Sequence, residues 1–431
     1  MDCPQRQKTS NFKERRMFNI KFIRDNAEIV KDALRKKGVK INIDDVLKKD
    51  EKRRELIKRV EDLRHKKNVK GKEISMLKKE GSNADTIISE MQRINKEMAD
   101  DELELEAIEK ELKEILKWIP NIPHSSVPNK QKIIREGGNI PKFDFEPKDH
   151  LFLSEVHKIL DMKTGAKIAG THFPLYRDKG ARLERALINF MLDLHTSKHN
   201  YVEIFPPFLA KEESMFGTGQ LPKMKEDMYL VEKDNLYLNP TAEVPLTNIH
   251  NNDVLKRDEL PVKYTAYTAC FRREAGSYGR DTKGLMRVHQ FNKVELVKFA
   301  LPEKSYNELE LLLEDAEDVL KLLNLPYRIV LLSYDDISFA SAKTYDIEVW
   351  APGLKRWLEV SSVSNFEDFQ ARRANIKYRD GNKLEFVHTL NGSGIATPRT
   401  FVGIIENFQK KDGSIRIPEV LWDYTKFREI P

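Results

Sequence analysis

Apolar residues recur at helical spacing along a long, highly charged stretch near the amino terminus, between Asp44 and Leu116, which contains no proline. Its first half places Leu56, Leu63 and Leu77 on one heptad position and Val60 and Ile74 on another. Its second half repeats apolar residues in steps of three and four, with Asp101 as the one polar interruption: Ile87, Met91, Ile94, Met98, Leu105, Ile108, Leu112 and Ile115. This pattern predicts two coiled-coil helices.

The segment between the two halves, Glu80-Gly81-Ser82-Asn83-Ala84-Asp85, is rich in residues that end or cap helices. Two long helices joined by such a turn form an antiparallel hairpin. At ~1.5 Å per residue, an arm of roughly 35 residues would extend about 50 Å. A shorter amphipathic helix is predicted before the arm, over Asn26–Lys37, with Asp25 or Asn26 as its cap and Gly38 at its end.

The two predicted arm helices differ in charge. The second is acidic, with Glu102, Glu104, Glu106, Glu109, Glu111 and Glu114. The first is basic, with Lys48, Lys49, Lys52, Arg53, Arg54, Lys58, Arg59, Arg64, Lys66, Lys67, Lys70, Lys72, Lys78 and Lys79. Two interpretations stay open: the basic helix follows a phosphate backbone, or the two helices neutralise each other in a solvated coiled coil.

Pro120, Pro123 and Pro128 mark a linker, after which strands and helices are mixed. Alternating apolar residues predict strands over Tyr201–Phe205, Val262–Phe271, Arg287–Lys298, Thr344–Trp350 and Trp357–Ser361, and a hairpin joining Met228–Val231 to Leu236–Leu238. Helices are predicted over Leu183–His195, with Asn200 ending it in a left-handed conformation, and near Arg399–Asn407. Because strict alternation of strand and helix is missing, the fold class is predicted to be α+β, with an antiparallel sheet.

These patterns predict a domain over residues 17–118, whose arm covers about 44–116, and a second domain over residues 119–431. Residues 1–16 are polar and carry Asp2 and Glu14, so we expect a disordered extension rather than a targeting peptide. No apolar run approaches the ~20 residues that span a membrane. A cytoplasmic protein is therefore predicted.

Charged residues make up 33% of the 431 residues, and the net charge of +6 permits an acidic partner without requiring one. The two cysteines, Cys3 and Cys270, show no CxxC spacing. A disulfide framework and a cysteine-rich zinc site are therefore not expected.

The sequence contains no Walker A motif and no GxGxxG after a strand. Three other stretches could form a nucleotide site together. The first is a helix–strand–proline unit, Ala181–Pro207, and the second is Phe271–Gly276, where Arg272 and Glu274 would share one face if the strand continued. The third, Asn391–Gly394, is predicted to be a glycine-rich loop before a helix start, which suits the approach of an anionic ligand. Each signal is weak alone.

Read together, the three stretches resemble motifs 1, 2 and 3 of class II aminoacyl-tRNA synthetases. Longer strings are similar to the bacterial-type seryl-tRNA synthetase family: Gly217–Pro222, Thr241–Glu243, Val288–Phe291, Glu367–Arg373 and Asn375-Ile376. The resemblance runs from Met17 to about Tyr424 and includes the arm. It implies a homodimer with a class II catalytic domain, which activates L-serine with ATP and Mg²⁺ and loads it onto tRNA(Ser), with tRNA(Sec) as a further family substrate.

The resemblance also implies an ATP site. Arg272 would contact the α-phosphate and the serine carboxylate, Glu274 the adenine amino group, and Arg399 the γ-phosphate, while Phe291 stacks on the ring. Glu359 would hold Mg²⁺ and phosphate oxygens together with Ser362, and Arg272, Glu359 and Arg399 would be the catalytic residues. The full implied ATP set is Arg272, Arg273, Glu274, Val288, Phe291, Glu359, Val360, Ser361, Ser362 and Arg399.

For serine, the resemblance implies that Thr241 and Glu243 hold the ammonium group and that Glu295 and Ser393 read the hydroxyl group, with Asn391 beside them. The implied serine set is Thr241, Ala242, Glu243, Arg272, Glu295, Asn391 and Ser393. The sequence departs from the family pattern at Arg273, usually serine, at Val363 and Phe366, often cysteine, and at Pro398. The zinc-dependent variant of the enzyme is not expected.

Two alternatives stay open. A related ligase could pass an activated amino acid to a carrier protein, although such an enzyme has no use for a tRNA-binding arm. A non-catalytic descendant of a synthetase is the other alternative, although Arg272, Glu274, Glu359 and Arg399 are all retained.

Overall fold

A computed structural model of the chain describes residues 19–275 and 283–431. The expected extension over residues 1–16, Cys3 and the end of the second motif stretch at Gly276 lie outside the described residues. The chain divides into two compact units, of which the first ends at Pro120 and the second begins at Asn121. Within residues 19–275 and 283–431, no helix has the length and apolar character needed to cross a membrane.

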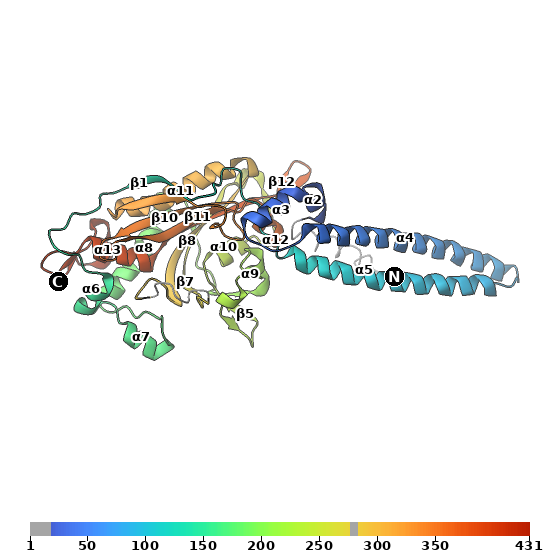
Figure 1. Cartoon of the computed structure of the whole chain (residues 1–431), viewed down its shortest axis with the longest axis horizontal. Helices are drawn as coiled ribbons and strands as arrows, with labels where there is room; N and C mark the ends of the chain where they lie inside the picture. Colours follow the sequence, from blue (N-terminus) through green and yellow to red (C-terminus); the bar gives the residue numbers. More distant parts are fainter. Residues whose placement is uncertain (1–18, 276–282) are drawn as a thin grey trace. The chain divides into compact units, whose positions relative to one another are not determined.

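The amino-terminal unit is built around two antiparallel helices, α4 (Ile43–Lys79) and α5 (Asp85–Leu116), which lie side by side as a hairpin (Figure 1). The short helices α2 (Ile20–Asp25) and α3 (Ala27–Lys36) precede them. Apolar residues of both arm helices pack together near the base of the hairpin: Val46, Leu56, Ile108 and Leu112. The predicted two-helix arm is therefore confirmed.

Ion pairs join the two arm helices. The polar interruption in the apolar pattern, Asp101, is only 5% exposed and accepts a hydrogen bond from Arg59 Nη2 at 2.7 Å. Further pairs connect α4 with α5: Lys49 with Glu111, Lys52 with Glu104, Arg53 with Glu109, Arg64 with Glu102 and Lys70 with Glu90. Part of the basic charge on α4 is thus neutralised by α5, as one of the two interpretations requires.

An eight-stranded sheet organises the second unit, in the order β1-β9-β10-β11-β14-β8-β7-β2. Neighbouring strands are antiparallel except β2 and β7, which are parallel. The strands are β1 (Lys132–Gly137), β2 (Val202–Glu203), β7 (Val262–Phe271), β8 (Gln290–Ala300), β9 (Tyr327–Leu331), β10 (Lys343–Ala351), β11 (Arg356–Asn365) and β14 (His388–Ala396). The predicted α+β class with an antiparallel sheet is confirmed.

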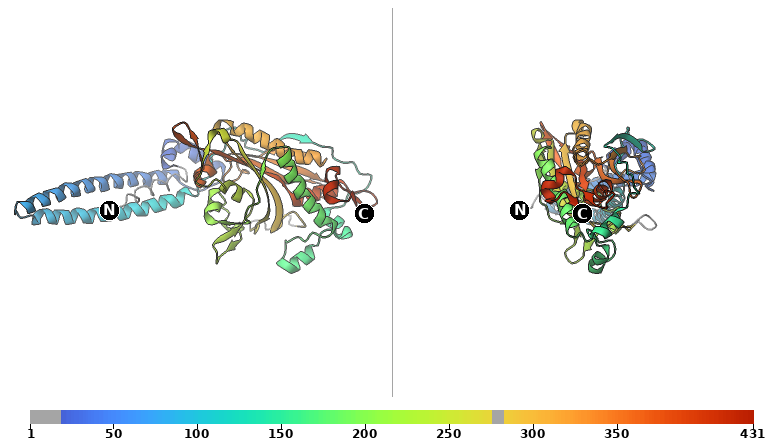
Figure 2. Two further views of the ribbon diagram at one scale, coloured as in Figure 1. Left: turned by 180° about the vertical axis from the view of Figure 1, so that it is seen from behind. Right: turned by 90° about the vertical axis from the view of Figure 1, so that its left-hand side faces the viewer.

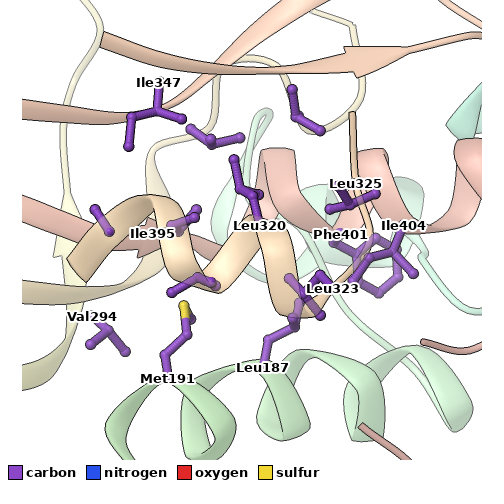
Figure 3. Close-up of a cluster of buried hydrophobic side chains, with 14 of the residues drawn as sticks. Leu187, Met191, Val294, Leu320, Leu323, Leu325, Ile347, Ile395, Phe401 and Ile404 are labelled. Atoms are coloured by element: carbon purple, nitrogen blue, oxygen red, sulfur yellow. The ribbon is translucent and has the colours of Figure 1, made fainter. Parts of the chain in front are cut away.

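Three helices cover one face of this sheet (Figures 1 and 2): α8 (Lys179–Ser197), α11 (Ser305–Leu322) and α13 (Thr397–Asn407). Their apolar sides form the main core with side chains of the strands. Figure 3 shows Leu187 and Met191 of α8 directed toward Leu320 of α11, with Val294 of β8 nearby. This layer fixes the sheet from one side, while the other face carries a smaller apolar cluster, which includes Val297 and Phe299 of β8, and polar residues.

Shorter elements surround the sheet. The helices are α6 (His150–His157), α7 (Met162–Ala169), α9 (Glu212–Gly217), α10 (Glu243–Asn248), α12 (Phe369–Ala374) and α14 (Trp422–Thr425), with 3₁₀ turns at Lys225–Asp227, Arg257–Glu259, Pro302–Lys304 and Glu419–Leu421. The small sheets pair β3 (Leu209–Lys211), β5 (Leu236–Leu238) and β4 (Leu230–Val231); β13 (Lys383–Phe386), β12 (Lys377–Asp380) and β6 (Val254–Lys256); and β15 (Ile415–Arg416) with β16 (Glu429–Ile430). The predicted hairpin of β4 and β5 is confirmed.

Two local predictions were wrong. Asn391–Gly394 is not a loop but lies within β14, paired with β8 on one side and β11 on the other. Its glycines allow close packing: a Cβ atom on Gly392 would lie 3.2 Å from Val363 Cγ2 and 3.4 Å from Leu312 Cγ. The strand predicted over Tyr201–Phe205 shortens to β2, because only Val202 and Glu203 pair with β7.

Two neighbouring leucines of α11 test whether packing of this helix against the sheet stabilises the fold. Leu312 is fully buried beneath Gly392, whereas Leu311 is 47% exposed. We expect Leu312→Ala to lower the free energy of unfolding by about 2–5 kcal/mol, because it removes buried methyl groups and leaves a cavity. The matched variant Leu311→Ala should change it by about 0.5 kcal/mol or less. Urea unfolding followed by tryptophan fluorescence measures both, and equal effects would contradict this assignment of the core.

Candidate active site

Alternation along β8 separates core residues from polar ones. Val294 and Leu296 belong to the main core, so Lys293 and Glu295 point to the opposite face of the sheet. Ser393 of β14 pairs directly with Glu295 in the register of the two strands. Residues paired in this way share one face, and the face without α8, α11 and α13 therefore carries the predicted serine-binding residues Glu295 and Ser393.

A hydrogen-bonded cluster surrounds Glu295, which is 1% exposed. Its Oε2 atom accepts a hydrogen bond from Thr241 Oγ1 at 2.7 Å and lies 2.5 Å from Lys293 Nζ. Thr241 Oγ1 also accepts from the backbone N–H of Glu243 at 3.2 Å, at the start of α10. Three of the predicted serine-binding residues thus meet, together with Lys293, which the sequence analysis did not single out.

Burial sets the charge of the second carboxylate. Glu243 is buried, and this raises its pKa to about 7, with the negative charge of Glu295 adding to the effect. A hydrogen bond from Gln370 and the positive charges of Lys293 and Arg272 lower the pKa in turn. A carboxylate in this position can bind an ammonium group, because the incoming positive charge would hold it ionised.

Arg272 follows directly after β7. Its Nε donates to Pro240 O at 3.2 Å, and its guanidinium lies 5.2 Å from the ring centre of Phe291. The structure therefore brings Arg272, Phe291 and the Thr241 segment together.

The prediction that Arg272 and Glu274 share one face required the strand to continue to Glu274. The strand ends earlier. β7 ends at Phe271, Glu274 has a positive φ of 53°, and its carboxylate pairs with Arg287 Nη1 at 2.7 Å. The backbone N–H of Arg273 donates to Asp227 O at 2.7 Å, which draws the chain away from the sheet, and the Arg273 guanidinium stacks over Tyr229 at 4.5 Å.

Arg399 lies at the start of α13 and joins two other segments. Its Nη1 atom donates to Glu359 O at 2.7 Å and lies 3.5 Å from Glu359 Oε2, while Nη2 donates to Met286 O at 3.4 Å. The predicted residues Glu359 and Arg399 are therefore in direct contact.

Side-chain oxygen atoms gather on β10 and β11. Ser362 Oγ donates to Asp346 Oδ1 at 2.6 Å and lies 3.2 Å from Glu359 Oε1. Burial and the neighbouring Glu359 carboxylate raise the pKa of Asp346 well above its usual range. One or two carboxylates and a hydroxyl group fit Mg²⁺, which takes its remaining ligands from phosphates and water.

The two groups of residues are linked through the centre of the sheet. Ser361 Oγ donates to Ser393 O at 2.7 Å, so β11 and the Glu359 group contact β14 and the Glu295 group. Asn391 lies on the same strand and is half-buried. Three predicted residues have buried side chains instead: Val288 and Val360 lie in the main core and Ala242 in a second apolar cluster, so only their backbones could contact a ligand.

Sequence reasoning missed several polar residues that complete the site: Lys293, Asp346, Gln370 and Arg287. Lys293 could have been found, because it alternates with Glu295 and Phe291 along β8. Asp346 could not, because its contact with Ser362 depends on the register of β10 against β11.

Glu184 of α8 supports the site from the core side. Its Oε1 atom accepts hydrogen bonds from Asn292 Nδ2 at 2.9 Å and from Thr397 Oγ1, so one side chain joins α8, β8 and α13. Its Oε2 atom is buried without a hydrogen-bond partner. Burial raises the pKa of Glu184 to about 7.

The raised pKa of Glu184 predicts a pH-dependent stability. Between the unfolded value of 4.5 and about 7, the folded chain holds a proton that the unfolded chain releases, so stability falls as pH rises. Across this range, the wild type should lose about 3 kcal/mol relative to Glu184→Gln, which keeps the acceptor but cannot ionise. Urea unfolding of both proteins at pH 5 and pH 8 measures the difference, and parallel curves would show that Glu184 does not titrate in this way.

Comparison with known proteins agrees with this arrangement. The family model "Seryl-tRNA synthetase N-terminal domain" matches residues 17–123, and "tRNA synthetase class II core domain (G, H, P, S and T)" matches residues 229–408. A serine–tRNA ligase of Carboxydothermus hydrogenoformans is 53% identical over 415 residues, covering 95% of this chain and 98% of the relative. One of Desulforamulus reducens is 54% identical over 415 residues, with the same coverage.

Among solved structures, the seryl-tRNA synthetase of Pyrococcus horikoshii, complexed with ATP, superposes with a TM-score of 0.90 at 38% identity, covering 96% of this chain and 99% of that one. The cytoplasmic serine–tRNA ligase of Naegleria fowleri, in complex with AMP, superposes with a TM-score of 0.86 at 27% identity, covering 96% and 98%. Similarity over nearly the full length of each protein, in both sequence and fold, shows that the chain belongs to the seryl-tRNA synthetase family.

Proposed function

We propose that the protein activates L-serine with ATP, forming seryl-adenylate and pyrophosphate, and then transfers serine to the 3′ end of tRNA(Ser), and of tRNA(Sec) where that tRNA is present. The observation that carries the proposal is the buried cluster of Thr241, Glu243, Glu295 and Ser393 next to Arg272. Such a set provides anionic groups for an ammonium, hydroxyl-binding oxygens for an alcohol and an arginine for a carboxylate. The Pyrococcus horikoshii relative was solved with ATP, which supports ATP as the second substrate.

Serine recognition follows from these groups. Thr241 and Glu243 would hold the ammonium group, while Glu295 and Ser393 would bind the hydroxyl group, with Asn391 beside them and Ala242 contributing its backbone. Alanine would leave buried polar groups unpaired, at about 1–3 kcal/mol for each.

Adenylate formation requires that two anions approach each other, because the serine carboxylate attacks the α-phosphorus and expels pyrophosphate. Arg272 would lie between the carboxylate and the α-phosphate, and Arg399 would bind the γ-phosphate end, so both offset the repulsion. Glu274 and Phe291 would hold adenine, with Arg273 and the backbones of Val288, Val360 and Ser361 completing the ATP site. Glu359 and Ser362 would hold Mg²⁺, which supplies further positive charge when bound.

The arm supports the second half of the proposal. Among the described residues, Lys58, Lys66 and Lys72 have no ion-pair partner, and all three are exposed on α4, the helix that also carries the neutralised lysines. We infer that these free charges contact the phosphate backbone of tRNA. We accordingly propose residues 17–118 as the tRNA-binding domain and residues 119–431 as the catalytic domain. This boundary rests on the assignment of tRNA contacts to the arm and of adenylate formation to the rest of the chain.

We also propose that the enzyme is a homodimer that works in the cytoplasm. Around the parallel edge strand β2, Phe205 is 79% exposed and Val202 57% exposed, and an apolar sheet edge of this kind is suited to a partner subunit. A cytoplasmic location follows from the use of tRNA as substrate. The two alternatives, a carrier-protein ligase and an inactive homologue, are not favoured.

Serine-dependent exchange of pyrophosphate into ATP tests the activation step. Wild-type protein assayed with each of the twenty amino acids should give exchange with serine alone. Arg272→Ala should lower the exchange rate about 100-fold or more, because it removes charge stabilisation from the transition state. Arg379→Ala, an exposed arginine on β12, is the matched control and should exchange at the wild-type rate. Exchange that is unaffected by loss of Arg272 would refute its role.

Lysine variants of the arm test tRNA binding. Replacing Lys58, Lys66 and Lys72 by alanine should raise the KM for tRNA about tenfold and reduce its salt dependence, because phosphate contacts are lost, while exchange is unchanged. The control replaces three exposed lysines of α5: Lys96, Lys110 and Lys113. Aminoacylation assays at several salt concentrations compare the two, and an equal defect in both would show that α4 has no special role.

A further inference from the structure

Gln370 of α12 occupies a central place beside the proposed serine site, although no role has yet been given to it. The side chain is 1% exposed and makes three hydrogen bonds. Nε2 donates to Glu243 Oε1 at 2.6 Å and to Thr218 O at 3.1 Å, and Oε1 accepts from Thr389 Oγ1 at 2.7 Å. These partners allow only one orientation of the amide, because the opposite one would place its oxygen against two acceptors.

The bond to Glu243 joins a neutral donor to a buried carboxylate. The charged groups that act on Glu243 come from β8, namely Glu295 and Lys293, and from the segment after β7, namely Arg272. Burial and Glu295 both favour the neutral carboxyl form, and the hydrogen bond donated by Gln370 opposes them. Without this donor, Glu243 would ionise less readily. It would also lose the hydrogen bond that fixes the orientation of its Oε1 atom.

The same helix holds the loop that carries Thr218. Arg373, one turn after Gln370, donates from Nη1 to Phe216 O at 3.4 Å and to Leu221 O at 3.1 Å. Its guanidinium packs on the rings of Phe369, at 4.3 Å, and Phe216, at 4.5 Å. Gly219 has a positive φ of 86°, and a Cβ atom there would lie 3.1 Å from Phe369 Cε1. Thus α12 fixes both ends of the 216–221 loop and, through Gln370, its middle.

We propose that Gln370 is a positioning residue for amino-acid recognition, which holds Glu243 ionised and correctly oriented for the substrate ammonium group and couples it to the 216–221 loop. The proposal rests on the proposed function, since it assigns the Glu243 carboxylate to the serine ammonium. Thr389 acts on Glu243 only indirectly, because its hydroxyl group fixes the orientation of the Gln370 amide.

Gln370→Met keeps the length of the side chain and removes all three hydrogen bonds. We expect the KM for serine in pyrophosphate exchange to rise about 10- to 100-fold, with the KM for ATP within about twofold of the wild type. The acidic limb of kcat/KM for serine should move to higher pH by about one unit, because Glu243 must be ionised to bind an ammonium group and its pKa has risen. The defect should therefore be larger at pH 6.5 than at pH 8.5.

Gln409→Met is the matched control. Gln409 is 5% exposed and its amide also makes three hydrogen bonds, to the backbone of Lys148 and Glu406. It should lower the melting temperature to a similar degree and leave the KM for serine and the pH profile unchanged. If both variants alter the serine KM equally, the effect of Gln370 is structural and the proposal is wrong.

If Gln370→Met does not fold, Thr389→Val tests the same proposal in the same assay. It is nearly isosteric and removes only the hydroxyl group that orients the amide, so the KM for serine should rise about threefold, with the acidic limb shifted in the same direction. An unchanged KM and pH profile in Thr389→Val or in folded Gln370→Met would overturn the proposal. Wild-type protein without serine-dependent exchange would instead overturn the proposed function, so the two failures are distinguishable.

Discussion

The arrangement of the site depends on keeping charged groups ionised where the sheet buries them. Burial disfavours the charge of Glu243, and the neighbouring Glu295 carboxylate adds to this effect. Lys293, Thr241 and Gln370 supply the positive charge and hydrogen bonds that oppose it. Under the proposed function, a substrate that adds its own hydrogen bonds and positive charge to this network would be distinguished from one that leaves buried polar groups unpaired.

A rigid apolar layer makes this precision possible. Because α8, α11 and α13 press against one face of the sheet, the polar residues are held on the other face by a core that resists deformation. Gly392 lets β14 approach α11 and Val363 closely, and Glu184 ties α8 to β8 and to the start of α13. Residues of the core layer thus determine where Ser393 and Arg399 lie.

The arm obeys a different constraint. Its apolar seam is narrow, and several lysines and arginines of α4 are neutralised by acids of α5, so the hairpin is held by charge as well as by packing. The basic charge that remains unpaired is available to a polyanion. The ion pairs support the interpretation in which complementary charges stabilise the hairpin, while contact of the remaining charge with a phosphate backbone stays a proposal.

Local sequence patterns determined much of this protein. The helical period predicted the arm, and alternation predicted β7 with its observed bounds. The family resemblance implied that Arg272, Glu295, Glu359 and Arg399 belong to one site, and Glu359 and Arg399 are in direct contact. The helical period and the strand alternation depend on neighbours within a few residues, so they can be read from the chain itself.

Tertiary structure alone decided how the strands pair. It turned the glycine-rich segment around Gly392 into a central strand, set Ser393 opposite Glu295, and brought Asp346 to Ser362 and Gln370 to Glu243. The alternating pattern says which residues of a strand share a face, but not which strand lies alongside or in which register. Those choices depend on partners far away in the sequence, because the pairing that buries the most apolar surface and satisfies the most polar groups is a property of the whole fold.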